Sequence, residues 1–273
     1  MKKDKPHYIS VIIPVMNEEE NIRILADEIA ESLRDIPWEW ECVWVDDFST
    51  DGTVPELEKI RTADKRHRIL LHTMNYGQSA ALATGFSLAQ GDIFVTIDGD
   101  GQNDPAFIPV LVQKLIAENA DMVNGWRKKR RDSIVRKISS KIANSFRNLL
   151  TGENIRDVGC ALRAFRRECA ECVPVFKGMH RFFPTLVRIA GHTKILEEPV
   201  QHRPRERGRT KYGINNRLWV GIADTFAVCW MRSRLVFPEV RGNDLKKEVV
   251  KPCGDLRSPQ NDREYPLRAT AKD

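Results

Sequence analysis

The sequence lacks the long apolar runs of membrane-spanning helices, and we expect no N-terminal secretory signal. No stretch of the 273 residues is apolar enough to cross a bilayer, and MKKDKPHY leads directly into the strand-like run ISVIIPV. The six cysteines are scattered, and the single C-x-x-C, Cys169 and Cys172, has no second pair. We therefore expect free thiols in a cytoplasmic protein, without a disulfide framework or a zinc site.

Two nucleotide-binding signatures are also missing. No G-x-G-x-x-G follows the first apolar run, which argues against a dinucleotide-binding dehydrogenase. An RNP-like motif and an aromatic-rich strand face are absent, so we expect no nucleic-acid partner. The formal net charge of +6 still favours an anionic partner. A non-catalytic basic module that binds membrane or nucleic acid therefore stays open as an alternative.

The stretch from Asp92 to Pro105, DIFVTIDGDGQNDP, organises the predicted site. Its apolar, β-branched start predicts a buried strand, and the strand ends at Asp98 and Asp100. In open α/β sheets, ligands bind outside the carboxyl ends of the strands. Two neighbouring carboxylates repel each other unless a cation lies between them, and a hard divalent ion carrying substrate phosphates is the usual solution. Taken alone, the motif is equally compatible with an Asp/Gly-rich turn that has no chemistry.

Strands and helices alternate along the N-terminal half. Asn17 can cap a helix whose apolar positions recur at helical spacing as far as Leu33. Apolar runs predict three further strands, at residues 9–15, 42–45 and 69–72. The small residues that follow Gly77 predict a helix that can pack closely on the sheet. This alternation predicts an α/β protein with a Rossmann-like, mostly parallel sheet flanked by helices.

Several ordered motifs resemble a known family. VIIPVMNEEENI, VWVDDFSTDGT, NYGQSAALATGF and DGDGQNDP are similar to segments of family 2 glycosyltransferases with the GT-A fold. With DVGCALRAFRRE, they resemble the dolichyl- and polyprenyl-phosphate sugar transferases over roughly Ile9 to Gly213. The resemblance implies a metal-dependent, inverting enzyme that moves a sugar from a nucleotide-sugar donor to a polyprenyl-type phosphate. The same donor chemistry with a hydroxyl acceptor, in lipid or cell-surface polysaccharide synthesis, is the alternative.

The resemblance also implies the donor site. Pro14, Glu18, Val45 and Asp47 match positions that hold the nucleoside. Met16 departs from the Tyr that dolichyl-phosphate mannosyltransferases tend to carry, so the sequence does not specify the base or the sugar.

The D-x-D itself has a counterpart in the family. Asp98, Gly99 and Asp100 match the nucleotide- and metal-binding motif, with Mg²⁺ or Mn²⁺ as the expected cofactor, and Gln102 lies just beyond it. In the resemblance, Asp98 and Asp100 are the metal ligands.

Basic residues are expected at the leaving group. Arg127 matches an arginine that meets the phosphates, and Arg205 and Lys211 match a basic pair on a loop that closes over the diphosphate. Cleavage of a sugar nucleotide leaves an anionic diphosphate, which a metal, arginine and lysine can stabilise. Arginine offers a planar fork that suits phosphate. Without the D-x-D, the segment from Arg205 to Lys211 would be interpreted as a solvated basic loop.

The acceptor side offers one candidate base. Asp157 matches an acidic position of the family, and Arg163 lies in the same motif. A phosphate acceptor, whose second pKa is about 6, is largely ionised and needs no base, whereas a hydroxyl acceptor would. Asp157 could serve as that base, or it could form a structural cap or a salt bridge to Arg163.

Two segments suit a membrane surface. Residues 133–150, preceded by the basic run 127–131, predict a basic amphipathic helix, and residues 217–237 predict an apolar helix with tryptophans and flanking arginines. Packing on the core is the alternative for both, and a homodimer contact is a further alternative for residues 217–237. We expect a catalytic domain over residues 1–237, peripheral on the inner face of the cytoplasmic membrane. A charged, disordered tail is expected over residues 238–273.

Overall fold

The computed structural model describes residues 7–128, 155–171, 173–204, 215–234, 239–240 and 248–249. The predicted basic helix at 133–150 lies outside these residues, as do Arg205 and Lys211. The chain divides into two units, Met1–Val236 and Phe237–Asp273. In the second unit, β8 (Glu239–Val240) pairs antiparallel with β9 (Glu248–Val249). The functional assignment of these units stays a prediction.

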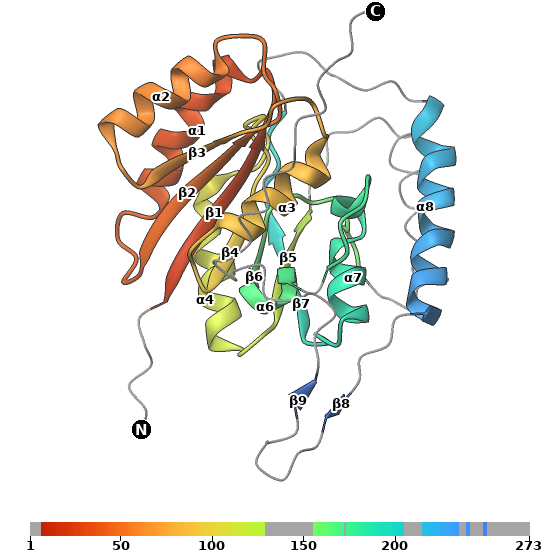
Figure 1. Ribbon diagram of the computed structural model, residues 1–273. Helices are drawn as coiled ribbons and strands as arrows, with labels where there is room; N and C mark the ends of the chain where they lie inside the picture. Colours follow the sequence, from red (N-terminus) through yellow and green to blue (C-terminus); the bar gives the residue numbers. More distant parts are fainter. Residues whose placement is uncertain are drawn as a thin grey trace, which may run out of the picture. The chain divides into compact units, whose positions relative to one another are not determined.

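The first unit is built on a seven-stranded sheet with the order β3-β2-β1-β4-β6-β5-β7 (Figure 1). Its strands are β1 (Tyr8–Val15), β2 (Glu39–Asp46), β3 (His67–Leu71), β4 (Ile93–Thr96), β5 (Met122–Arg127), β6 (Arg163–Arg166) and β7 (Ile195–Val200). All neighbours pair in parallel except β6, which runs antiparallel to both β4 and β5. The predicted mostly parallel α/β sheet is therefore confirmed.

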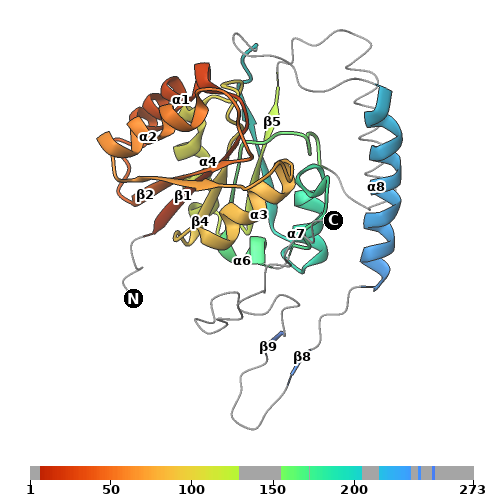
Figure 2. The same cartoon turned by 45° about the horizontal axis from the view of Figure 1, so that its top comes forward.

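Helices cover both faces of this sheet, as Figures 1 and 2 show. One core lies under α1 (Glu19–Ser32), α2 (Thr53–Ala63) and α4 (Ile108–Ala117). The other lies under α3 (Gln78–Leu88), α6 (Arg167–Glu171) and α7 (Phe183–Ile189). Along β1, Ile9, Val11 and Ile13 enter the first core and Ile12 enters the second. Because successive side chains point to opposite faces, a strand buried on both faces becomes a continuous apolar run.

The helix α3 approaches the sheet closely. A Cβ added at Gly85 would lie 2.4 Å from Cγ2 of Ile12 on β1, so the helix can sit at this distance only with glycine there. Its neighbours Ala81 and Leu82 are buried against the same face. The small residues of the sequence thus bring the first turn of α3 next to the ends of the strands.

The helix α8 (Asn215–Arg234) lies beside α7 (Figure 2), and it contacts the short 3-10 turn η2 (Met179–Arg181). Val228 belongs to the second core, and Asp224 lies 3.5 Å from the Arg181 guanidinium. Phe226 and Trp230, one turn apart, are 56% and 63% exposed. Within the described part of the chain, no helix has the length and hydropathy needed to cross a membrane.

The prediction that Asn17 caps α1 is wrong. The N-cap is Glu18, and its side chain makes no capping hydrogen bond. Asn17 adopts a positive φ of 49°, and its Oδ1 accepts a 2.7 Å hydrogen bond from the Thr50 amide in the loop after β2. Asparagine tolerates this backbone conformation, so the residue ties together two loops at the carboxyl edge of the sheet.

Candidate active site

The site lies where three neighbouring strands end. The order β2-β1-β4 places the segments that follow Asp46, Val15 and Thr96 side by side at one edge of the sheet. Pro14 on β1 is the register partner of Val45 on β2, so two of the predicted nucleoside residues are neighbours. The D-x-D follows β4 and therefore lies next to the β1 end.

Asp98 is held by one neutral donor and lies among several charges. Its Oδ1 accepts a 2.8 Å hydrogen bond from the Gln78 side-chain amide at the start of α3. Burial raises the pKa of Asp98 well above its usual range, and the Asp100 carboxylate raises it further, while Arg163 and Arg127 oppose the shift. A cation between Asp98 and Asp100 would relieve this cost.

The glycines of the D-x-D satisfy specific spatial requirements. A Cβ at Gly99 would lie 2.6 Å from Cγ1 of Val15, so the motif can lie against β1 only with glycine there. Gly101 has a φ of +70°, which glycine adopts without strain. The turn brings the Gln102 amide to 3.2 Å from Oδ1 of Asp100. Backbone and side chain thus fix the second carboxylate locally.

The residues just after the D-x-D pair with the segment that leads into the predicted basic loop. The Arg203 amide donates a 2.8 Å hydrogen bond to the Gln102 carbonyl, and Asn103 forms a β-bridge with His202. The Arg203 guanidinium pairs with Glu28 at 2.7 Å and with Asp104 at 3.0 Å. This described segment ends at residue 204, and the predicted basic pair Arg205 and Lys211 lies outside the described residues.

Two of the predicted nucleoside residues already bind protein groups. Asp47, 4% exposed, accepts hydrogen bonds from the Tyr76 amide at 2.8 Å, the Gly77 amide at 2.7 Å and the His72 ring at 2.8 Å. The Glu18 carboxylate accepts from Asn21 at 2.8 Å. Both side chains therefore shape the loops around the site, and their roles toward a nucleoside remain predictions.

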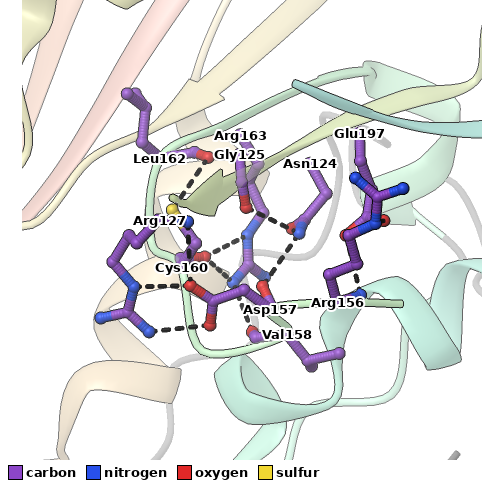
Figure 3. Close-up of polar contacts among 10 residues, drawn as sticks. All are labelled: Asn124, Gly125, Arg127, Arg156, Asp157, Val158, Cys160, Leu162, Arg163 and Glu197. Atoms are coloured by element: carbon purple, nitrogen blue, oxygen red, sulfur yellow. Dashed lines mark hydrogen bonds and ion pairs between the residues drawn. The ribbon is translucent and has the colours of Figure 1, made fainter. Parts of the chain in front are cut away.

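Asp157 pairs with Arg127, not with the Arg163 that the sequence suggested. Its Oδ2 lies 2.6 Å from the Arg127 Nε and its Oδ1 lies 2.8 Å from a terminal nitrogen, which makes a two-pronged ion pair (Figure 3). Both side chains are mostly buried, and the pair raises the pKa of Arg127 although burial opposes this. The predicted phosphate-binding arginine and the predicted base are thus a single unit.

Arg163 stabilises the backbone near this pair. Its guanidinium donates to the carbonyls of Cys160 and, at 3.2 Å, of Val158 (Figure 3). It also donates to the His180 carbonyl at 3.4 Å. The residue is 5% exposed. Its contacts indicate that it supports the loop carrying Asp157, and substrate contact by Arg163 stays a prediction.

Sequence reasoning missed Gln78 and Ser79 as site residues. Gln78 bonds to Asp98, and the Ser79 hydroxyl lies 2.9 Å from Nδ1 of His180. Both residues stand in the motif NYGQSAALATGF. The motif itself was a signal, but its polar positions could not be assigned a partner without the packing of α3 against β4.

Solved structures of other proteins share this fold. Glucosyl-3-phosphoglycerate synthase from Mycobacterium tuberculosis, solved with Mn²⁺, UDP and its product, has the same fold with a TM-score of 0.61 at 22% identity, and the match covers 90% of this chain and 88% of that one. The same enzyme solved with Mg²⁺ and UDP gives a TM-score of 0.62. The structure therefore has the GT-A fold that the sequence predicted.

The sequence comparison defines the family. The profile of glycosyl transferase family 2 matches residues 10–173, and the chain belongs to this family. Dodecaprenyl-phosphate galacturonate synthase of Rhizobium johnstonii is 37% identical over 223 residues, which is 81% of this chain and 66% of that protein. Undecaprenyl-phosphate 4-deoxy-4-formamido-L-arabinose transferase of Pectobacterium carotovorum is 38% identical over 207 residues, 76% of this chain and 63% of that one. The chain thus spans slightly less than two thirds of the length of these relatives.

Proposed function

We propose that this protein is an inverting glycosyltransferase that moves a sugar from a nucleotide-sugar donor to a polyprenyl-type phosphate. The observation that carries the proposal is the position of Asp98 and Asp100 at the carboxyl edge of the sheet, in a chain of glycosyl transferase family 2. Two relatives are named for transfer to dodecaprenyl and undecaprenyl phosphate, which supports the acceptor class.

A divalent cation, Mg²⁺ or Mn²⁺, fits the residues at the D-x-D. The described residues contain no group of three or more His, Cys, Asp or Glu side chains that could enclose a metal. Asp98 and Asp100 would therefore provide one or two ligands, and diphosphate oxygens and water would complete the shell, as is usual for Mg²⁺. The bound ion would supply positive charge at the leaving diphosphate.

The chain itself would hold the donor in place. Pro14 and Val45, adjacent across β1 and β2, would border the nucleoside together with Glu18 and Asp47. The D-x-D of Asp98, Gly99 and Asp100 would bind the diphosphate, with Gly99 packed against Val15 of β1 and the Gln102 amide bonded to Asp100. These residues bind and orient the substrate, which lowers the entropic cost of reaching the transition state.

Positive side chains would stabilise the diphosphate as it leaves. Arg127 lies close enough to Asp98 for the two charges to interact, and Arg205 and Lys211, which follow Arg203 in the sequence, would act with it. Charge placed in advance at the leaving group stabilises the transition state more than the ground state. Arg163 would support this side of the site from behind.

The ion pair of Asp157 with Arg127 is compatible with a phosphate acceptor, because that acceptor needs no protein base. An ionised phosphate can displace the diphosphate directly, with inversion, and needs no protein base. Asp157, bound through both oxygens to Arg127, would then position that arginine. With a hydroxyl acceptor, the same carboxylate would have to accept a proton in the reaction.

The helix α8 would place the protein at the membrane. Phe226 and Trp230 are exposed one turn apart, and Arg232 and Arg234 follow at the C-terminal end. Aromatic rings and arginines suit the interface of an anionic bilayer. A peripheral position on the cytoplasmic face would bring the site to its lipid acceptor.

The test is detection of the lipid product. The enzyme is incubated with a panel of sugar nucleotides, Mn²⁺ and undecaprenyl phosphate, and the extracted lipid is analysed by mass spectrometry and NMR. We expect one donor to give a glycosyl undecaprenyl phosphate with the opposite anomeric configuration. Donor cleavage without a lipid product, but with transfer to a hydroxyl acceptor, would replace the acceptor class. The absence of nucleotide binding would contradict the proposal.

A further inference from the structure

Gln78 is the one residue of α3 whose side chain reaches the D-x-D by a hydrogen bond in the described structure. Its Nε2 donates to Oδ1 of Asp98 over 2.8 Å. This bond engages one carboxylate oxygen and determines how the other is oriented. Gln78 is half-buried at the first position of the helix, so its backbone is fixed before the side chain is placed.

The turn before Gln78 is hydrogen-bonded to Asp47, the residue that follows β2. Asp47 accepts hydrogen bonds from the two preceding amides, Tyr76 at 2.8 Å and Gly77 at 2.7 Å. His72 bonds to Asp47 at 2.8 Å through Nδ1 and to Thr84 of α3 at 2.9 Å through Nε2. Strand β2, the loop and the helix are therefore joined by a partly buried network that leaves Gln78 little freedom.

The next residue is held from the opposite side. The Ser79 hydroxyl contacts Nδ1 of His180 at 2.9 Å and accepts a 3.1 Å bond from the Gly178 amide. Gln78 therefore lies between two anchored neighbours, Gly77 and Ser79. A side chain anchored in this way can select one orientation of the group that it contacts.

We propose that Gln78 is the positioning residue of Asp98, which it holds in the orientation that receives the metal-bound diphosphate of the donor. This inference rests on the proposed function. A neutral amide is suited to the task because it donates to the ionised carboxylate without bringing a positive charge that would compete with the cation. Lysine or arginine at the same place would partly neutralise the site. Partners of this kind typically change metal affinity about 10–100-fold when they are removed.

The experiment measures the Mn²⁺ affinity of the whole protein by calorimetry and electron paramagnetic resonance. One Mn²⁺ titration is made in the presence of UDP and a parallel one in the presence of GDP. Gln78→Met keeps the length and helix propensity of the side chain but removes its donor. Gln113→Met, at an exposed position of α4, is the matched control. Thermal unfolding and metal-free nucleotide affinity are measured for each protein.

We expect Gln78→Met to weaken Mn²⁺ binding about tenfold or more. Its melting temperature and metal-free nucleotide affinity should equal those of wild type and of Gln113→Met. Unchanged Mn²⁺ affinity in Gln78→Met would overturn the inference and leave the proposed function intact. Equal losses of metal-free and metal-dependent binding would also overturn it, because the residue would then support the fold in general. Failure of the wild type to bind Mn²⁺ with either nucleotide would instead count against the proposed function.

Discussion

The ion pair between Asp157 and Arg127 makes opposite predictions for the two acceptor classes. Asp157→Ala would leave a mostly buried guanidinium without its partner and should lower the free energy of unfolding by about 3 kcal/mol, which urea denaturation measures. If the acceptor is a phosphate, turnover should fall but persist, because no base is required. Arg127→Met combined with Asp157→Leu should recover most of the lost stability. A stable Asp157→Ala protein with no turnover would identify Asp157 as a base.

Phe48 has an unfavourable backbone conformation. It follows Asp47 with a φ of +67°, a strained conformation for a non-glycine residue. Its side chain is 48% exposed, so burial of the ring offsets little of this strain. Phe48→Gly should stabilise the protein by about 1 kcal/mol, raising the melting temperature by about 2–4 °C. Phe48→Ala keeps the unfavourable conformation and is the control. Equal melting temperatures for Phe48→Gly and wild type would show that the strain is offset elsewhere.

At the residue scale, the sequence predicted which acids lie at the strand ends but not what they contact. Asp98 and Asp100 were found because the apolar run before them ends abruptly. The partners of Asp47, Asp157 and Gln78 depend on side-chain directions in the folded chain, which no local pattern encodes.

The pairing of β2 with β3 contains a pH-sensitive contact. Trp44 on β2 donates a 3.0 Å hydrogen bond to Nδ1 of His67 on β3, and burial lowers the pKa of His67. The neutral ring is favoured in the folded state, so this contribution is fully present above the unfolded pKa of about 6.5 and is lost as pH falls through the folded value. His67→Asn keeps an acceptor that does not titrate. Its free energy of unfolding should therefore fall less than that of wild type between pH 7 and 5, by urea denaturation. Parallel curves would contradict this.

On α8, the residues that are proposed to contact the membrane differ from those that pack on the core. Val228 and Met231 pack on the second core, whereas Phe226 and Trp230 are exposed. Phe226→Ser with Trp230→Ser should reduce sedimentation with vesicles of phosphatidylglycerol at least about tenfold and leave the melting temperature unchanged. Ile24→Ser, at an exposed position of α1, is the control. Undiminished vesicle binding by the double variant would locate any membrane contact elsewhere.

At the scale of elements, the first four strands were predictable because each contains a short apolar run; β1, β2 and β4 are almost wholly buried, and the edge strand β3 is half-buried. Their runs at residues 9–15, 42–45, 69–72 and 93–97 agree with β1 to β4 to within a few residues at either end. The later strands β5, β6 and β7 were not predicted. They contain Asn124, Arg163 and two glutamates, polar residues that the site and the edge of the sheet require and that interrupt the apolar pattern.

For the molecule as a whole, the order of the motifs carried more information than any one of them. Five short segments between Val11 and Glu168 indicated one family, and the profile of that family covers residues 10–173. The proposed acceptor was less accessible to prediction, because the position of α8 depends on tertiary contacts such as Asp224 with Arg181, which no local pattern encodes.

The most direct measurement is the rate of nucleoside diphosphate release from the preferred sugar nucleotide, with Mn²⁺, with and without undecaprenyl phosphate, for wild type and Asp100→Asn. Asparagine keeps the oxygen that accepts the Gln102 amide, so the variant should fold, but it removes a charge from the D-x-D. We predict metal-dependent release that the lipid phosphate stimulates in wild type, and a loss of roughly 100-fold or more in Asp100→Asn. Lipid-stimulated release that persists without metal, or at full rate in folded Asp100→Asn, would contradict the account.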